Sequence, residues 1–539
     1  MRTKITTVAI WAVGALAASP TFAQSGGSDA EIALLKQQLH LLEQKLDRLE
    51  KQGAANTRAA ASAKEEARAA AASANAAIPA KAALQPKGGA VSSEAVVSMP
   101  NNRPTICSTD GQNCISLTSR IHFDGGGYDY HPNTAATVPQ RLDDGVNLRR
   151  ARIGVLGKFM GDWNYALIYD FGGSSDGFAS TATVPVGGVP VAVGFLPGGA
   201  LSGVENAYLS YTGFRPFGGT LAIEGGILDL PITLDEASSS NDIPFMERAS
   251  SGVIARSFAA DDFRSAFGGR WFNDVFWAGA YVTGPTTGAI HSASSVNPNG
   301  TTEQLGAAAR VAGQIVSGKD YSLHLGADAE FLIDPPHNLV TKTQTLTFAD
   351  RPELRIDPTT LISTGAIANV SGAQVYNVEA AATYGPLFFQ GEYFWFNVDR
   401  NAVTGLPPFG APSLKFQGGY AEATFILTGE TRKYNAAAAA YQGVVPEHPV
   451  SLADGGWGAW EIAGRVSTID LNNQLGTATG IAGGRQTVYT AGLNWYVNRN
   501  VRFLFDYFHG NVAKQISPTN IGDAGAKFDA FAMRTQVAF

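Results

Sequence analysis

Apolar and polar residues alternate along short segments that recur from residue 116 to the C-terminus. In the segment 146–159, for example, Ala151 lies on one face of an extended chain, and Arg150 and Arg152 lie on the other. A repeat of two residues predicts β-strands, because only an extended chain places successive side chains on opposite faces. This alternation therefore restricts most of the chain to an all-β fold.

About sixteen such segments occur, an even number that suits a closed barrel. Their centres lie near residues 120, 152, 167, 208, 224, 267, 278, 309, 326, 380, 391, 421, 463, 490, 505 and 533. Tight turns such as Gly161-Asp162 alternate with long connections rich in Gly, Ser, Pro and Thr, except that one connection on the short-turn side, 429–456, is long. We therefore predict a transmembrane antiparallel β-barrel of the bacterial outer membrane over residues 115–539.

The composition excludes other classes of protein. Only 16% of the residues are charged, against about 25% in soluble domains. Beyond the extreme N-terminus, no uninterrupted apolar run reaches the ~20 residues of an α-helical membrane span. The formal net charge of −7 lacks the basic excess of proteins that follow a phosphate backbone, so we expect no nucleic acid partner.

The N-terminus carries an export signal followed by a helical segment. Arg2 and Lys4 precede an apolar stretch from Ile5 to Ala18, and Thr21-Phe22-Ala23 then fits a cleavage site, which predicts a signal peptide over residues 1–23. Apolar residues then recur at spacings of three and four, which predicts a short α-helical coiled coil over residues 24–52, in the periplasm. The alternative is an isolated amphipathic helix. The residues of this seam are Ile32, Leu35, Leu39, Leu42, Leu46 and Leu49.

Residues 53–114 are predicted to form an Ala-rich linker between the coiled coil and the barrel. The chain's two cysteines, Cys107 and Cys114, lie at the end of this linker. In an oxidising compartment they are a candidate disulfide that closes a small loop, and two unpaired thiols are the alternative. No cluster of His residues lies nearby, so we expect no metal site.

The polar face of each strand is expected to point into the lumen, because a charge that faces lipid at mid-membrane costs about 2 to 4 kcal/mol. The candidates to line the pore are Arg150, Arg152, Lys158, Arg264, Arg270, Arg310, Glu224, Asp328 and Glu330. By the same alternation further charged residues point inward, among them Arg120, Arg465, Arg502, Arg534, Asp124, Asp170, Glu379, Glu392, Glu422, Glu461 and Asp506. On one interpretation, cationic and anionic walls face each other across the channel and their electric field orients solutes. On the other, each arginine simply pairs with a carboxylate inside a polar barrel.

The connection over residues 230–261 is long enough to fold back and narrow the lumen of a sixteen-stranded barrel. The alternative is a surface loop that covers the outer rim. If the connection does narrow the lumen, its candidate constriction residues are Asp235, Glu236, Asp242, Glu247, Arg248 and Arg256.

Signals for catalysis are weak. No HExxH, CxxC or P-loop motif occurs, and the eight His residues are scattered along the chain. His324, on a predicted lumen face, is expected to be a polar wall residue rather than a general base. We therefore expect no enzymatic activity and no cofactor.

Several stretches together resemble the family of phosphate-selective porins O and P. They are Leu148 to Gly154 with Gly161-Asp162-Trp163, Asn206-Ala207-Tyr208, Asn241 to Arg248, Arg351 to Arg355, Gly429-Glu430 and the strands that end at Phe539. The resemblance implies a trimeric outer-membrane channel of sixteen strands. It also implies that Arg149, Arg150 and Arg152 correspond to an inward-facing double-arginine strand of the kind that gives the family its anion selectivity. A terminal aromatic residue such as Phe539 resembles the assembly signal of outer-membrane barrels.

The sequence thus predicts an outer-membrane porin, a passive diffusion channel for small hydrophilic solutes, with anions such as phosphate as candidates. The expected partners are these solutes, outer-membrane lipid and two further copies in a homotrimer. The alternative function is a structural barrel anchor that tethers the outer membrane to the cell wall through the N-terminal coiled coil.

Overall fold

The computed structural model describes residues 95–133, 141–172, 182–186, 189–193, 203–259, 264–286, 303–337, 344–401 and 413–539. All of these belong to one compact unit, Ser92–Phe539. The predicted signal peptide, the predicted coiled coil and most of the predicted linker lie outside the described residues.

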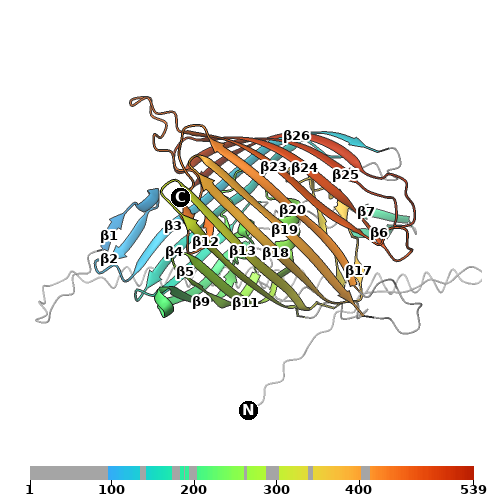
Figure 1. Ribbon diagram of the computed structural model, residues 1–539, viewed down its shortest axis with the longest axis horizontal. Coiled ribbons are helices and arrows are strands. Elements are labelled where there is room, and N and C mark those ends of the chain that lie inside the picture. The colour runs from blue at the N-terminus through green and yellow to red at the C-terminus, as the bar shows by residue number, and fades with distance from the viewer. Residues whose placement is uncertain are drawn as a thin grey trace, which may run out of the picture. The chain divides into compact units, whose positions relative to one another are not determined.

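Sixteen antiparallel strands in the described part of the chain form a closed barrel (Figure 1). Each strand pairs with the next, and the last one, β26, pairs with the first, β3. Every predicted segment centre lies within one of these strands, so the predicted all-β barrel is confirmed. The strands are β3 (Cys114–Pro132), β4 (Gly145–Phe159), β5 (Trp163–Asp170), β8 (Gly203–Phe214), β9 (Thr220–Leu228), β10 (Arg264–Phe272), β11 (Phe276–Thr286), β12 (Leu305–Ser317), β13 (Tyr321–Asp334), β18 (Val370–Tyr384), β19 (Leu387–Arg400), β20 (Ser413–Ile426), β23 (Ala459–Asn473), β24 (Ile481–Tyr496), β25 (Val501–Ala513) and β26 (Ala526–Ala538).

The remaining elements are short. None of the helices in the described ranges has the length and apolarity to cross a membrane. A hairpin of β1 (Ala95–Ser98) and β2 (Thr105–Ser108), joined through η1 (Pro100–Asn102), precedes β3. The others are β6 (Ala182–Val186), β7 (Val189–Val193), η2 (Pro216–Gly218), α2 (Leu234–Ala237), α3 (Ser250–Ala259), β14 (Thr345–Leu346), β15 (Ala349–Asp350), β16 (Ile362–Ser363), β17 (Ile367–Ala368), β21 (Tyr434–Asn435) and β22 (Ala440–Tyr441).

Connection length separates the two rims of the barrel. The rim that holds the C-terminus has short connections, such as 160–162 between β4 and β5 and 385–386 between β18 and β19. The exception on this rim is 427–458 between β20 and β23, where the sequence predicts a long connection. The opposite rim carries the long connections that bear on the lumen, 229–263 between β9 and β10 and 335–369 between β13 and β18.

Side-chain exposure follows the predicted alternation along the strands. On β19, Phe389 and Trp395 are 47% and 41% exposed on the outer face, whereas Gln390 and Glu392 are buried on the inner face. Bulky apolar and aromatic side chains on the outer face suit a wall that contacts lipid. The inner face is therefore where the polar residues of each strand meet.

Part of the inner face is apolar, which the alternation along the strands did not predict. Phe394 and Phe396 share the inner face of β19 with Glu392, yet both are fully buried. Phe396 packs against Phe348 of the β13–β18 connection, with ring centroids 5.6 Å apart, and Phe348 packs against Phe258 of α3 at 6.2 Å. These inward residues contact inserted protein rather than water, so their burial is favourable. We call the connections that fold into the lumen inserts. They supply an apolar core inside the barrel.

Candidate functional site in the lumen

The described part of the β9–β10 connection, residues 229–259, lies inside the barrel, where most of its side chains are buried. The Asn494 amide on β24 donates a hydrogen bond to the Pro244 carbonyl (2.8 Å), and Arg465 on β23 donates one to the Glu247 carbonyl (2.8 Å). The backbone N–H of Met246 donates to Asp506 on β25 (2.7 Å). The wall therefore satisfies polar backbone groups of the connection that could not otherwise be buried.

Four of the candidate constriction residues form a small ion-pair cluster within this connection. Arg248 lies 3.1 Å from Asp235 and 3.3 Å from Glu236, and Arg256 lies 3.3 Å from Glu236. The hydroxyl of Thr233 accepts a hydrogen bond from the Glu236 N–H (3.1 Å) and so caps α2. These contacts link α2, which begins the connection, to α3, which ends its described part.

Glu247 holds the middle of the connection against arginines of the wall. Its carboxylate lies 2.7 Å from Arg149 on β4 and 2.8 Å from Arg534 on β26, and all three side chains are buried. Arg355 of the β13–β18 connection lies 3.8 Å from it. Burial acts to raise the pKa of the Glu247 carboxyl, but Arg149 and Arg534 hold that pKa well below its usual range. The Glu247 carboxylate therefore joins the β9–β10 connection both to the wall and to the β13–β18 connection.

A β-bulge turns two adjacent arginines of β4 toward the lumen. His122 on β3 pairs with Arg150, and the next residue, Phe123, pairs with Leu148, so Arg149 is the extra residue of the bulge. Arg149 and Arg150 are only 2% and 4% exposed. Strict alternation would place one of these two charges in lipid, and the extra residue of the bulge removes that cost.

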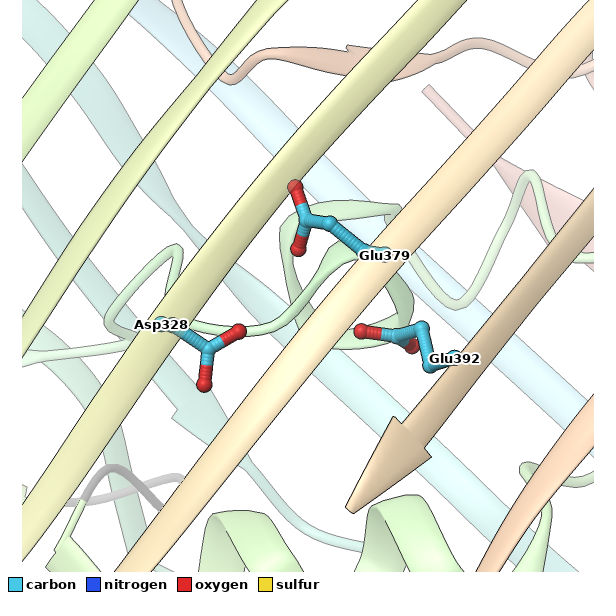
Figure 2. Close-up of side chains that lie close together, drawn as sticks. All are labelled: Asp328, Glu379 and Glu392. Carbon is cyan, nitrogen blue, oxygen red and sulfur yellow. The ribbon is translucent and has the colours of Figure 1, made fainter.

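Three inward-facing carboxylates gather on neighbouring strands, Asp328 on β13, Glu379 on β18 and Glu392 on β19 (Figure 2). One oxygen of each lies within 4.8 Å of the others. Glu379 pairs with Arg310 (2.8 Å) and His324 (2.9 Å). His324 is thus a buried polar residue of the wall.

Glu392 in this cluster fastens the β9–β10 connection to the wall. It accepts hydrogen bonds from the backbone N–H groups of Leu234 (2.7 Å) and Asp235 (2.9 Å) at the start of α2. It also accepts from the Asn377 amide (2.8 Å) and the Tyr420 hydroxyl (2.7 Å). Four donors saturate this carboxylate, which leaves it little capacity to bind a cation. The contacts fit an anchor for the connection better than a metal site.

The β20–β23 connection enters the lumen from the opposite rim and meets the β9–β10 connection there. Arg310 donates to the carbonyls of Ala438 (2.9 Å) and Ala439 (2.8 Å) on one side and of Pro231 (3.1 Å) on the other. Arg432 donates to the Asp242 carbonyl (2.7 Å). Sequence reasoning identified this connection by its length alone and missed that it folds inward.

A cavity of about 680 Å³ lies between these inserts and the wall on the rim that holds the C-terminus. Ten Arg or Lys side chains line it, against three acidic ones, Asp229, Glu236 and Asp242. Among the predicted pore-lining and constriction residues it includes Arg150, Arg152, Arg270, Glu236, Asp242, Arg248 and Arg256. The other basic residues are Arg120 and Arg502 on strands and Arg103, Lys433 and Arg499 on turns, where the alternation of strands gave no signal.

The remaining predicted residues lie away from this cavity. Lys158 is half-buried, Glu330 is buried, and Arg264 donates to the Gly284 carbonyl (2.9 Å). Glu224 pairs with Arg270 at 3.0 Å and accepts from the Tyr281 hydroxyl at 2.6 Å. Asp235, Glu247, Arg310 and Asp328 take part in the contacts described above.

Cations that line the cavity differ in how they are neutralised. Arg152 forms ion pairs with Asp170 (2.8 Å) and Glu205. By contrast, Arg120 donates to the hydroxyls of Ser239 (3.0 Å) and Ser240 (2.6 Å). Likewise, Arg502 donates to backbone carbonyls of the β9–β10 connection, and Arg150 contacts the His122 ring at 3.5 Å. The cavity therefore keeps positive charge that its own carboxylates do not balance.

The comparisons with known proteins agree with this architecture. A family model described as phosphate-selective porin O and P matches residues 115–539. Porin O of Pseudomonas aeruginosa is 30% identical over 184 residues, which are 33% of this chain and 38% of that protein. An uncharacterized protein of Caulobacter vibrioides is 32% identical over 186 residues, which are 34% of this chain and 33% of that protein. The matched regions thus span between 33% and 38% of the length of these curated relatives.

Among solved structures, the outer membrane protein OmpT of Vibrio cholerae aligns with 79% of this chain and 98% of its own, with a TM-score of 0.43 and 11% sequence identity.

Proposed function

This chain belongs to the family of phosphate-selective porins O and P, and from that premise we propose that it is an outer-membrane porin, a passive channel that favours small anions. The family match covers the whole barrel, residues 115–539. Membership in a family of channels also supports solute passage rather than catalysis.

The single observation that carries the preference for anions is the excess of cations around the lumen cavity. Arg120, Arg150 and Arg502 bind hydroxyls, a ring nitrogen and carbonyls rather than carboxylates, so their charge acts on solutes in the cavity. Walls of low dielectric constant concentrate such a field and raise the local concentration of counter-ions. Anions would therefore enter this cavity more readily than cations of the same size.

We further propose that the β9–β10 connection forms the constriction of the channel. Its attachment at Glu392, Glu247 and Asp506 supports this role, because these contacts hold it against the wall at three places. The β20–β23 connection narrows the same space from the other rim through Arg310 and Arg432. Solutes would then pass beside these inserts, along the wall that carries Arg120 and Arg150.

Assembly and placement follow from the same proposal. We expect a homotrimer in the outer membrane, with residues 24–52 as a coiled coil in the periplasm. The alternative role, a tether to the cell wall, depends on those same residues, which lie outside the described part of the chain.

Planar-bilayer recording of the purified protein in a salt gradient tests the proposal. We expect stepwise channels whose zero-current potential has the sign of anion preference. The variant Arg215→Gln serves as a control and should keep the same zero-current potential, because Arg215 is exposed on a turn and does not line the cavity. A barrel that conducts no ions, or one that prefers cations, would contradict the proposed function.

A further inference from the structure

The ladder that closes the barrel joins the strands that are farthest apart in the sequence, β3 and β26. A shift of β26 along β3 by one residue would turn every side chain of the strand to the opposite face, so the alternation of polar and apolar residues disfavours it. A shift by two residues keeps each side chain on its face, so the alternation does not prevent it. Three consecutive glycines of β3, Gly125 to Gly127, lie opposite Met533, Ala532 and Phe531. Glycine offers no side chain to interlock with its partner, so packing specifies the register weakly here.

The β1–β2 hairpin occupies the edge of β3 at the point where β26 ends. Ala538 of β26 pairs with Arg120, and Phe539 exchanges two backbone hydrogen bonds with Ser119, of 2.9 and 3.0 Å. The backbone N–H of Leu117, the next outward-facing residue of β3, donates to the Pro104 carbonyl at 2.9 Å.

From that point β2 continues the ladder toward the N-terminal end of β3. It pairs with Ser116, Ile115 and Cys114. The edge of β3 is therefore filled without a gap, first by β26 and then by the hairpin, beside the C-terminus in Figure 1.

Several bonds fix the hairpin in this position. A disulfide joins Cys107 of β2 to Cys114 of β3. Asn102 of η1 donates to the side chain of Asn500 in the β24–β25 turn (2.5 Å), and Arg499 of the same turn donates to Asn101. The Asn500 amide in turn donates to the Ala538 carbonyl at the end of β26 (2.7 Å). The hairpin and the end of the last strand are thus held by the same turn.

We propose that the β1–β2 hairpin is a register stop for barrel closure. A shift of β26 by two residues toward the short-turn rim would bring Phe539 opposite Leu117, whose N–H the hairpin already holds. The C-terminal strand would then have to displace Pro104 and Thr105 from the edge of β3. The hairpin excludes this competing register and also covers an edge that would otherwise lie open.

One other feature favours the native register, and the test must separate it from the hairpin. Arg534 lies directly opposite Asp124 and binds it through two hydrogen bonds of 2.7 Å. A shift by two would move Arg534 opposite His122, beside Arg150. If this ion pair alone set the register, removal of the hairpin would leave the ladder unchanged.

Two pairs of engineered cysteines report the register. Ile121→Cys with Val537→Cys joins partners of the native ladder, and Ser119→Cys with Val537→Cys joins partners of the ladder shifted by two. A disulfide forms only where the Cα atoms lie within about 7 Å, so each pair reports its own register. The background is the full chain with Cys107→Ser and Cys114→Ser. Cross-linking after mild oxidation changes the mobility of the unfolded, unreduced chain on a gel.

With the hairpin present, we expect only the native pair to cross-link. When residues 95–108 are deleted, we expect the shifted pair to cross-link in up to about a tenth of the folded barrels. This fraction is typical of a minor conformation in equilibrium with the main one, here the shifted and the native register. A barrel without the hairpin that cross-links only through the native pair would overturn the proposal.

A second variant keeps the full chain and releases the hairpin from the β24–β25 turn through Asn101→Ala and Asn102→Ala in the same background, which leaves the bond from Asn500 to Ala538 in place. It is expected to cross-link through the shifted pair as well, at a lower level. If the deletion variant fails to fold, this variant decides alone, and the native pair as its sole cross-link would overturn the proposal.

Discussion

Arg534 on the last strand reaches Asp124 on the first strand and Glu247 of the inserted connection at the same time, with N···O distances of 2.7 and 2.8 Å. One guanidinium therefore joins the ladder that closes the barrel to the segment that narrows its lumen. Arg149 binds the other side of Glu247, so closure of the barrel and placement of the connection depend on the same carboxylate.

Glu247→Gln is expected to destabilise the barrel. The substitution leaves Arg149 and Arg534 buried without the charge that they share. Loss of one partner from a buried ion pair costs about 3 to 5 kcal/mol, and we expect the lower figure because Arg534 keeps Asp124. Unfolding in denaturant, followed on gels of unheated samples, measures the change. Glu447→Gln, at an exposed position, is the control and should unfold as the native protein does.

Glu392→Gln is expected to loosen the β9–β10 connection. A neutral amide accepts more weakly from the Leu234 and Asp235 N–H groups, and hydrogen bonds to a charged group contribute about 1.5 to 3 kcal/mol each. Single-channel recordings should show larger current noise and a higher mean conductance. Glu447→Gln, at an exposed position, is the control. Equal noise in both variants would contradict the anchor role.

Deletion of residues 24–90, which spares β1, should leave trimers and conductance intact. The predicted coiled coil would then add avidity to contacts that the barrels already make. Gels in mild detergent and bilayer recordings measure the two properties. Monomers after the deletion would show that the coiled coil creates the assembly, and loss of envelope integrity with unchanged conductance would favour the tether.

The strands could be predicted because their signal is local. Alternation of single residues sets which face each side chain occupies, and the outward Phe389 and inward Glu392 follow from it. The same rule places Glu379 beside Glu392 on the inner face. It cannot show that Glu392 binds the N–H groups of Leu234 and Asp235, because that contact joins segments about 160 residues apart.

The alternation of polar and apolar residues could not predict the inserts or the bulge. Inward phenylalanines such as Phe396 break the expected polar face because Phe348 and α3 fill the lumen there. A signal for the bulge was present, since two adjacent arginines in a membrane strand cannot both avoid lipid unless the ladder is interrupted. The disulfide between Cys107 and Cys114, left open by the sequence, joins β2 to β3.

Anion preference should weaken as salt rises. The Debye length falls from about 10 Å at 0.1 M to about 3 Å at 1 M ionic strength, so the field of the wall arginines reaches less of the cavity. Zero-current potentials measured at the same salt ratio, around a low and a high mean concentration, test this. A preference that does not change with ionic strength would point to a site that binds anions by direct contact.

Arg150→Gln should reduce the preference for anions more than Lys158→Gln does. Both residues lie on the inner face of β4, but only Arg150 lines the cavity, and its contact at 3.5 Å is to the His122 ring rather than to a carboxylate. A unit charge about 7 Å from a permeating ion in water changes its energy by about 0.6 kcal/mol, in opposite directions for an anion and a cation, so the anion-to-cation permeability ratio should fall about sevenfold. Zero-current potentials of the two variants in the same salt gradient measure the difference. Equal shifts, or none in Arg150→Gln, would mean that Arg150 serves the packing of the bulge and that Arg120 and Arg502 set the selectivity.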